Sequence, residues 1–589
     1  MSAPPGVDPI TFEVVRNGLE SIADEMAFTV VRSARANMIK DCMDFSTAVC
    51  DARGSVISQA LTIPLMLCAF PDALAAVLER FQGDLREGDV LLLNDPFEGG
   101  SHLPDVFLFK PVFHGGALAA FMATCAHHAD VGGMAVGSAA SDATEVFQEG
   151  LRIPPLKLYE GGRPNETLLA LLRRNVRFPE ILLADLHAQV AACRAGERAY
   201  GRLIARYGLG ELDGCLEALM DHSELITRRE IAALPDGTYT FTDHLDEDGL
   251  DPEAIPITVA VTIEGEELTA DFTGTAPMCR GSLNCSLSFT KACVYTAVKC
   301  ITRADIPENS GFFRPIHVVA PPGTVVHAVF PAATFMRGLT GYRINNVLFG
   351  ALAQAAPHRV VAADEGGTTI VLIDGHDGGG ERFMYMETIS GTWGARPDKD
   401  GIDCASNVTG LQSNVPVEVL ESEYPIRVER YGFIPDSGGA GRFRGGLGLL
   451  RQYRYLAEEG NLQVRADRVR FAPYGLFRGR PGARSKNLLV DRGGLHEELE
   501  AKVKRRLLRR GDVFLHLQAG GGGYGPPWER GVERVVEDVR DGKVSPLGAR
   551  RDYGVVLDPE SLEVDQPATA ALRAAMARAA GEERPLATW

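Results

Sequence analysis

The 589-residue sequence lacks the patterns that mark several common protein classes. Its 11 cysteines include no CxxC pair, which argues against a thiolate zinc site or a thioredoxin-like redox motif. No apolar run approaches the roughly 18 residues of a membrane-spanning helix, and the amino terminus has no basic stretch followed by an apolar core. Cysteines without paired spacing are typical of the reduced thiols of cytoplasmic proteins. Together these features lead us to expect a soluble, cytoplasmic protein without a signal peptide.

The chain also has fewer basic residues than acidic residues. The chain has 60 Lys and Arg residues against 78 Asp and Glu residues, which gives a formal net charge of −18. A chain of this sign repels phosphate, so we expect no nucleic-acid partner and no membrane partner; the run 502–510 is the only basic stretch. The sequence has no Gly-x-x-x-x-Gly-Lys-Ser/Thr loop, so by this criterion the chain has no nucleotide site of its own.

Glycine is the residue type in excess, with 64 copies that gather in particular segments. Helical and alternating periodicities follow one another along the chain, which predicts an α+β, multidomain protein. We expect mixed and antiparallel sheets with helical layers and glycine-rich β segments. The predicted divisions are an N-terminal α+β region (1–164), a helical region (165–235), a central β-rich α+β region (236–456), a β-rich, glycine-rich region (457–529) and a C-terminal helical segment (530–589).

The N-terminal region combines helices with short strands that end in polar turns. Periodicity predicts helices over 10–38 and 71–81, a hairpin over 45–59, and strands over 88–93, 106–113 and 117–126. Further along, the pattern predicts helices over 288–303 and 345–356. Turns at strand ends are common places for functional residues, because a rigid scaffold positions them.

Two of these polar turns contain residues that suit a metal site. One turn follows an apolar strand and includes His102 and Asp105, and the other ends a later strand with His127 and His128. Adjacent strand residues face opposite ways, so only one of the two neighbouring histidines joins a single site unless the chain turns. Two histidines and one carboxylate suit Zn, Mn or Fe. The alternative is a turn whose Asp and His residues only cap and solvate the surface.

Three further segments allow two interpretations each. Asp44 opens an apolar strand, where it either caps the strand start or supplies another metal carboxylate or a general base. The glycine run 519–525 either presents backbone N–H groups to an anion or forms a tight structural turn, and we favour the turn. For the glycine-rich segment 436–448, a β-turn framework is favoured over a ligand loop.

Several long motifs, in order along nearly the whole chain, resemble the hydantoinase B family. Relatives of that family include the C-terminal half of ATP-dependent 5-oxoprolinase and a large subunit of acetone carboxylase. The motifs are DFSTAVCD (44–51), NDPFEGGSHLPDV (94–106), AHHADVGG (126–133), EGLRIPP (149–155), EYPIRVERY (423–431), PDSGGAGRFRGGLG (435–448), AGGGGYG (519–525) and ARRDYGVVLD (549–558).

The resemblance implies a divalent metal, either Zn or Mn or alternatively Fe. The ligands that it implies are Asp44, His102, Asp105 and His127. His128 and Asp130 would then orient the ligands or carry protons. For a metal to bind, the chelating atoms must converge to within roughly 3 to 4 Å of one another.

The resemblance also implies a protein partner. Members of this family work with a hydantoinase A-type ATPase subunit that binds ATP, so we expect a hetero-oligomer that acts on a small molecule. In the lactam-cleaving members ATP activates the amide by phosphorylation, and the B-type chain opens the ring with a metal-activated water. The expected function is the metal-dependent subunit of an ATP-dependent cyclic amide hydrolase of hydantoinase, oxoprolinase or lactamase type.

Two positions depart from the family pattern and bear on the substrate. In the segment 62–68, Met66 stands where many members carry a His, and Cys68 replaces an expected Gly. If that His contacts substrate, the substrate differs from the familiar cyclic amides. Two other functions remain open: a subunit of an ATP-dependent ketone carboxylase, which shares the metal site, and a non-catalytic scaffold, which binds no metal.

Overall fold

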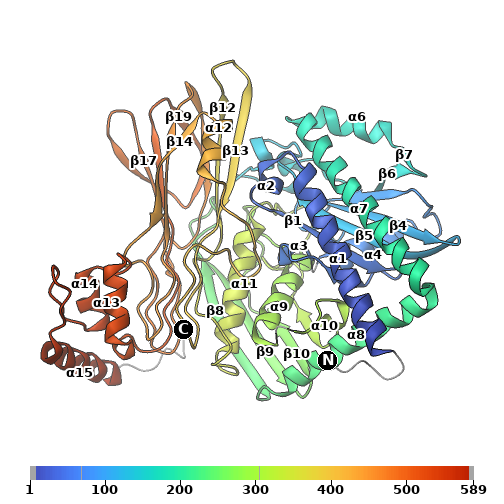
Figure 1. Ribbon diagram of the computed structural model, residues 1–589. Helices are drawn as coiled ribbons and strands as arrows, with labels where there is room; N and C mark the ends of the chain where they lie inside the picture. Colours follow the sequence, from blue (N-terminus) through green and yellow to red (C-terminus); the bar gives the residue numbers. More distant parts are fainter. Residues whose placement is uncertain (1–7, 68, 304, 583–589) are drawn as a thin grey trace. The chain divides into compact units, whose positions relative to one another are not determined.

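The computed structural model describes residues 8–67, 69–303 and 305–582 (Figure 1). The chain forms two compact units, each built from separated segments. The first unit contains residues 1–238, 260–341 and 408–413, and the second contains residues 239–259, 342–407 and 414–589. The predicted α+β class with antiparallel and mixed sheets is confirmed. The five-part division of the chain stays a prediction.

The first unit is organised around a seven-stranded antiparallel sheet in the order β2-β1-β5-β4-β3-β6-β7. Its strands are β1 (Phe45–Asp51), β2 (Val56–Gln59), β3 (Val90–Leu93), β4 (Asp105–His114), β5 (Ala117–His127), β6 (Leu156–Glu160) and β7 (Arg163–Pro164). The predicted hairpin over 45–59 is confirmed as β1 and β2, and the two later strands pair as β4 and β5.

The helices of this unit pack around the sheet. They are α1 (Pro9–Ser33), α2 (Asn37–Lys40), α3 (Pro64–Leu67), α4 (Phe70–Arg80), α5 (Val146–Glu149), α6 (Glu166–Asn175), α7 (Pro179–Tyr207), α8 (Leu209–Ala232), α9 (Leu287–Ile301) and α10 (Ser310–Phe313). α1 begins where the Asp8 carboxylate accepts a hydrogen bond from the Thr11 amide at 2.8 Å, and its apolar stripe from Phe12 to Val30 is buried.

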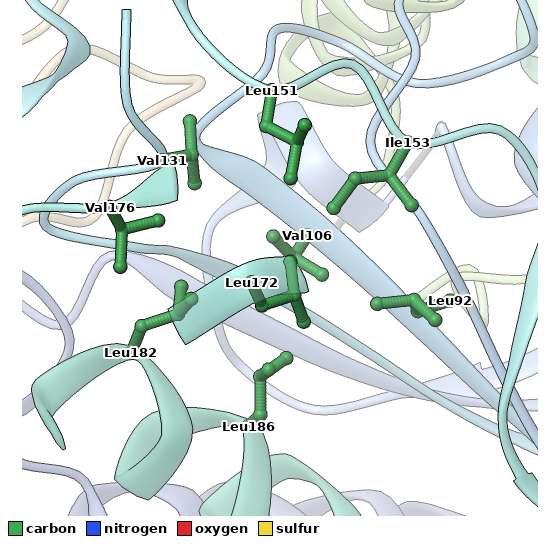
Figure 2. Close-up of a pocket in the computed structure, with 9 residues that line it drawn as sticks. All are labelled: Leu92, Val106, Val131, Leu151, Ile153, Leu172, Val176, Leu182 and Leu186. Carbon is green, nitrogen blue, oxygen red and sulfur yellow. The ribbon is translucent and has the colours of Figure 1, made fainter. Parts of the chain in front are cut away.

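Both faces of the seven-stranded sheet are buried, because side chains alternate between two helical layers. On one face α4 contributes Phe70, whose ring centre lies 5.7 Å from that of Phe107 on β4. On the other face α6 and α7 pack against β3 and β4 and leave a dry apolar cavity of about 10 Å³ (Figure 2). The cavity is lined by Leu92, Val106, Val131, Leu151, Ile153, Leu172, Val176, Leu182 and Leu186.

A mixed four-stranded sheet follows the order β11-β10-β9-β8, with β10 and β11 parallel. Its strands are β8 (Gly237–Leu245), β9 (Ile255–Glu264), β10 (Glu267–Asp271) and β11 (Ile316–Val319). Burial along β9 alternates strictly, as the sequence pattern predicts for a half-buried strand. The helix α11 (Arg337–Leu352) follows later in the chain and begins eight residues before the predicted start at 345.

The second unit contains two antiparallel sheets, in the orders β13-β12-β16-β19 and β14-β15-β20-β17-β18. Their strands are β12 (Thr369–His376), β13 (Arg382–Ile389), β14 (Ile426–Phe433), β15 (Leu449–Tyr455), β16 (Glu459–Arg465), β17 (Lys486–Val490), β18 (His496–Leu499), β19 (Lys502–Arg509) and β20 (Val513–Leu517). Its helices include α12 (Val417–Glu423), α13 (Val532–Arg540), α14 (Pro546–Tyr553) and α15 (Gln566–Glu582).

The glycine run 519–525 lies buried in the middle of the second unit, and it is not the tight turn that we favoured. Residues 519–523 form no turn, and neighbouring backbones surround them closely. The N–H groups of Gly521 and Gly522 donate to the carbonyls of Gly446 and Ala363 at 3.0 and 2.8 Å, so they are not available to an anion. A Cβ atom at Gly522 would lie only 1.9 Å from the carbonyl oxygen of Tyr474.

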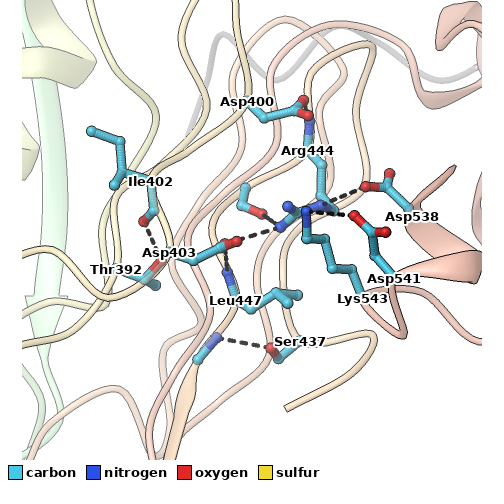
Figure 3. A network of polar contacts seen from close by, with 12 residues as sticks. Thr392, Asp400, Ile402, Asp403, Ser437, Arg444, Leu447, Asp538, Asp541 and Lys543 are labelled. Carbon is cyan, nitrogen blue, oxygen red and sulfur yellow. Dashed lines mark hydrogen bonds and ion pairs between the residues drawn. The ribbon is translucent and has the colours of Figure 1, made fainter. Parts of the chain in front are cut away.

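Buried ion pairs join α13 to the loops beside this glycine-rich core (Figure 3). Arg444 lies 3.3 Å from Asp403 and 3.7 Å from Asp538 of α13. Arg530 lies 2.6 Å from Asp400 and 2.7 Å from the same Asp538. Removal of one partner from such a buried network would leave an uncompensated charge, so these ion pairs hold α13 in place within the second unit.

Several cations of the basic run 502–510 pair with acidic side chains. Lys502 is fully buried and lies 3.0 Å from Asp467. The exposed Arg506 and Arg510 lie close to Glu497 and Glu458. Within the part of the chain that the structure describes, no helix combines the length and the apolar character needed to cross a bilayer.

Candidate metal centre

Three neighbouring strands place Asp44, His127 and Asp105 in one row. β5 lies between β1 and β4, and the register pairs Asp105 with His127 and Phe45 with Ala126. One step beyond the second pair, the His127 amide donates to the Asp44 carbonyl at 3.0 Å. Residues opposite each other on antiparallel strands project from the same face, so the row directs all three side chains to one side of the sheet.

Local backbone geometry adds His102 and aims Asp44. Asp105 donates its amide to the His102 carbonyl at 3.0 Å, which closes a turn and returns His102 to the end of β4. Met43, directly before Asp44, has a φ of 62°, the left-handed region that residues with side chains rarely adopt. That bend is held by the Asp44 amide, which donates to the Met38 carbonyl at 2.8 Å.

His102, Asp105 and His127 converge. One potential ligand atom from each lies within 4.8 Å of the others. The Nδ1 atom of His102 is 3.0 Å from Oδ2 of Asp105, and the ring centres of the two histidines are 5.0 Å apart. The separation is somewhat wider than the expected 3 to 4 Å, and Asp44 is not one of the three residues in this group.

The donor atoms fit a divalent metal. Buried atoms with no hydrogen-bond partner among the described residues include Nδ1 of His127 and Oδ1 of Asp105. Buried polar atoms are normally paired, so these two atoms beside the contact between His102 and Asp105 fit a site that binds a cation. His102 and Asp105 are at most 1% exposed, whereas Asp44 and His127 are each 5% exposed.

The protonation states of the site also suit a metal. Burial lowers the pKa of His102 to about 4 and that of His127 to about 3, so both imidazoles are neutral near pH 7, which is the form that binds metal. Burial opposes ionisation of Asp105, but His102 and Arg337 outweigh it and hold its pKa well below the usual range. Because His102 is itself neutral, the permanently charged Arg337 is the partner that matters.

The pKa of Asp44 shifts in the opposite direction to that of Asp105. Burial, followed by the nearby charge of Asp105, raises the pKa of Asp44 to about 8, although Arg337 and a hydrogen bond from Gln412 oppose the shift. Near pH 7 and without a cation, Asp44 is therefore mostly protonated. A divalent ion between the two carboxyl groups would favour the ionised form of Asp44.

The structure does not bring His128 and Asp130 to this group. His128 follows His127 and faces the other side of the sheet, where its Nε2 atom lies 2.9 Å from the Gln189 side chain of α7. The Asp130 carboxylate organises the loop that follows, because it accepts hydrogen bonds from the Gly137 amide and the Arg177 guanidinium, both at 3.0 Å. His128 therefore contacts α7 and Asp130 organises a loop, and a role of either residue in orienting ligands or carrying protons stays a prediction.

Sequence reasoning missed several residues beside the centre. An Arg337 nitrogen lies 2.5 Å from Oδ2 of Asp105, although 232 residues separate them in the chain. The Glu149 carboxylate accepts hydrogen bonds from the amides of Thr334 and Phe335 at 2.9 and 2.8 Å, and the Phe335 ring centre is 5.6 Å from that of His102. The motif EGLRIPP contains Glu149, but no local pattern indicates its partner segment.

Of the two positions that depart from the family pattern, the structure describes only Met66. Met66 is 2% exposed and belongs to the apolar cluster between α4 and the sheet, together with Phe70 and Phe107. It therefore acts as a core residue. Cys68 lies outside the described residues.

Comparison with known proteins places the chain in a family. Residues 8–527 match the family model described as hydantoinase B/oxoprolinase. The chain belongs to the hydantoinase B/oxoprolinase family. This membership confirms both the resemblance inferred from the motifs and the predicted enzyme class, a cyclic amidohydrolase subunit of the hydantoinase B and 5-oxoprolinase type.

Individual relatives agree along the whole length of the chain. A Pseudomonas sp. (strain NS671) protein, provisionally named as the B-type subunit of a D-/L-hydantoinase, is 34% identical over 96% of this chain and 98% of its own. The crystal structure of ATP-dependent caprolactamase from Pseudomonas jessenii has a TM-score of 0.90 and 32% identity, covering 97% of this chain and 100% of that one. Nucleotide-free acetone carboxylase has a TM-score of 0.91 at 18% identity, covering 98% and 84%, which shows a shared fold.

Proposed function

We propose that this hydantoinase B-family chain is the metal-dependent, ring-opening subunit of an ATP-dependent cyclic amide hydrolase. The observation that carries the proposal is the convergence of His102, Asp105 and His127, beside Asp44, at the end of one buried sheet. The substrate class follows from the caprolactamase and the hydantoinase protein that the chain resembles. Both substrates are small rings that contain an amide.

The division of labour requires a partner. A ring amide is a poor electrophile, and phosphorylation of its oxygen creates a good leaving group. The sequence has no phosphate-binding lysine loop, and the related hydantoinase protein is named as one subunit of its enzyme. We therefore assign ATP to a separate hydantoinase A-type subunit in a hetero-oligomer. Hydrolysis of ATP by the purified chain alone would contradict this assignment.

The residues of this chain have distinct tasks in the ring-opening step. A Zn or Mn ion at the centre would supply Lewis acidity for attack by water at neutral pH. His102 and His127 offer neutral imidazoles, and Asp105 offers an ionised carboxylate. Asp44 lies opposite His127 in the row and would add a second carboxylate to the set. The Phe335 ring packs beside His102, with the two ring centres 5.6 Å apart.

The metal assignment is tested by paired histidine substitutions in the purified full chain. We expect wild type to contain about one equivalent of Zn or Mn and His102→Ala to lose it, because one of three converging ligands is removed. His114→Ala is the matched control, since His114 is exposed at the far end of the same β4–β5 hairpin. Equal metal content in wild type and His102→Ala would overturn the site, and a metal-free wild type would favour a scaffold role.

The reaction is tested on the complex with its ATPase subunit. We expect ATP-dependent opening of a lactam or hydantoin, with loss of turnover in His102→Ala and normal turnover in His114→Ala. Labelled bicarbonate in the same assay separates hydrolysis from carboxylation, since a carboxylase would incorporate the label. The likeness to acetone carboxylase concerns the fold and does not favour that alternative.

A further inference from the structure

Arg337 places a buried cation directly beside the candidate metal centre. It is the first residue of α11 and is 8% exposed. One guanidinium nitrogen lies 2.5 Å from Oδ2 of Asp105 and donates to Ser101 Oγ at 3.2 Å. The guanidinium carbon also lies 4.5 Å from the centre of the Phe289 ring, which provides a cation–π contact.

These contacts occupy one oxygen of Asp105 and leave the other free. Oδ2 accepts from Arg337 and also from the Ser101 hydroxyl. Oδ1 is buried without a hydrogen-bond partner in the described part of the chain. A carboxylate with one oxygen held by two donors cannot rotate freely, so the direction of its second oxygen is fixed. The Nδ1 atom of His102 also lies 3.0 Å from the held oxygen, Oδ2, so these contacts orient the whole carboxylate relative to the histidines.

The segment that carries Arg337 is itself held in place. Its amide donates to the Thr334 carbonyl at 3.0 Å, and the preceding Met336 amide donates to the Ser282 carbonyl at 2.7 Å. Glu149 in turn fixes the amide of Thr334 with its buried carboxylate. The start of α11, which carries the guanidinium, is therefore fixed by hydrogen bonds of its backbone and of the segment before it.

Electrostatic attraction cannot be the reason for this arrangement. A permanently charged guanidinium beside the centre repels a divalent cation and so weakens metal binding on charge grounds alone. Orientation of a ligand acts in the opposite direction, since outer partners of metal ligands commonly contribute 10-fold to 100-fold in metal affinity. If Arg337 orients a ligand, its removal should weaken metal binding; if it acts only by repulsion, its removal should strengthen metal binding.

We propose that Arg337 is a positioning residue that holds the Asp105 carboxylate in the orientation in which it faces His102 and His127. Without this contact the Asp105 carboxylate would be free to rotate away from His102 and His127, and the three residues would hold a metal less well. The proposal rests on the metal centre of the proposed function. It assigns no contact between Arg337 and the substrate.

The experiment measures metal affinity rather than turnover. Co²⁺ is titrated into the metal-free full chain and followed by its d–d absorption, and Zn²⁺ affinity is measured by competition with a chelator. We expect Arg337→Met to bind both ions about 10-fold to 100-fold more weakly, with a changed Co²⁺ spectrum. Arg337→Lys should recover part of the loss, because it keeps the charge without the planar fork. Arg198→Met, an exposed site on α7, is the matched control.

Each outcome decides between the proposals. Ser101→Ala removes the second donor to Oδ2 and should show a smaller loss of affinity in the same direction, so the test holds even if Arg337→Met fails to fold. An unchanged affinity and spectrum in Arg337→Lys and Ser101→Ala, or tighter binding in Arg337→Met, would overturn the positioning role. Absence of metal binding by wild type would instead overturn the proposed function.

Discussion

Replacement of Gly522 by alanine should disrupt the core of the second unit. The added Cβ atom would lie 1.9 Å from the Tyr474 carbonyl oxygen, whereas Cβ atoms do not approach other heavy atoms closer than 3.0 Å. The two backbones must therefore separate by more than an ångström. Gly522 also donates to the Ala363 carbonyl and accepts from the Ala395 amide, both at 2.8 Å, and a shift of this size breaks both bonds.

The magnitude follows from these contacts. Each lost hydrogen bond costs about 1 kcal/mol net, and forced overpacking costs roughly 1 to 3 kcal/mol, so the free energy of unfolding should fall by about 3 to 5 kcal/mol. The offending atoms belong to backbone, so no side-chain rotation relieves the clash. Some of the strain would spread to the adjacent glycine-rich segments 437–446 and 475–483, whose backbones contact the same run.

The assay is urea unfolding followed by far-ultraviolet circular dichroism, with Gly432→Ala as the control. Gly432 lies exposed on β14 of the same unit, and a Cβ there meets nothing within 4 Å. We expect the control to match wild type to within about 0.5 kcal/mol, as is usual for surface sites away from special contacts. A Gly522→Ala variant as stable as the control would refute the account of close backbone packing.

Two further predictions concern stability and the residues near the centre. Burial lowers the pKa of His516 to about 3, so below about pH 6.5 the unfolded chain binds a proton that the folded chain does not. The free energy of unfolding of wild type should therefore fall as pH falls from 6.5 towards 3, by up to about 1.4 kcal/mol per pH unit from this group. In urea unfolding, His516→Gln should show a smaller dependence of stability on pH. Asp130→Asn should lower the free energy of unfolding by roughly 1 to 3 kcal/mol, because Asp130 holds Arg177 and a loop. Its metal content should stay at the wild-type level. Loss of turnover in a fully stable Asp130→Asn variant would indicate instead that Asp130 carries protons.

Local patterns predicted the parts of the fold that local physics controls. The hairpin of β1 and β2 and the pairing of β4 with β5 followed from alternation and polar turns, and those strands carry the row of Asp44, His127 and Asp105. The choice of His127 over His128 came only from the resemblance to a family. Alternation shows that one histidine must face away, but not which one.

Long-range contacts could not be predicted from a single sequence. Arg337 lies at the start of α11, which the periodicity placed at 345, because the first turn of this helix carries no clear apolar stripe. Its contact with Asp105 joins segments 232 residues apart. The run 519–525 was misjudged for a related reason, since glycine favours tight turns and close backbone packing alike, and only neighbouring segments decide between them.

The adjacent histidines at the end of β5 also have a consequence for how related sequences diverge. His127 faces the candidate metal ligands, whereas His128 faces Gln189 on α7. The substitutions allowed at these two neighbouring positions are therefore limited by different contacts. In related chains, a change at position 128 should be accompanied by a compensating change at position 189, while position 127 should stay fixed wherever His102 and Asp105 are retained.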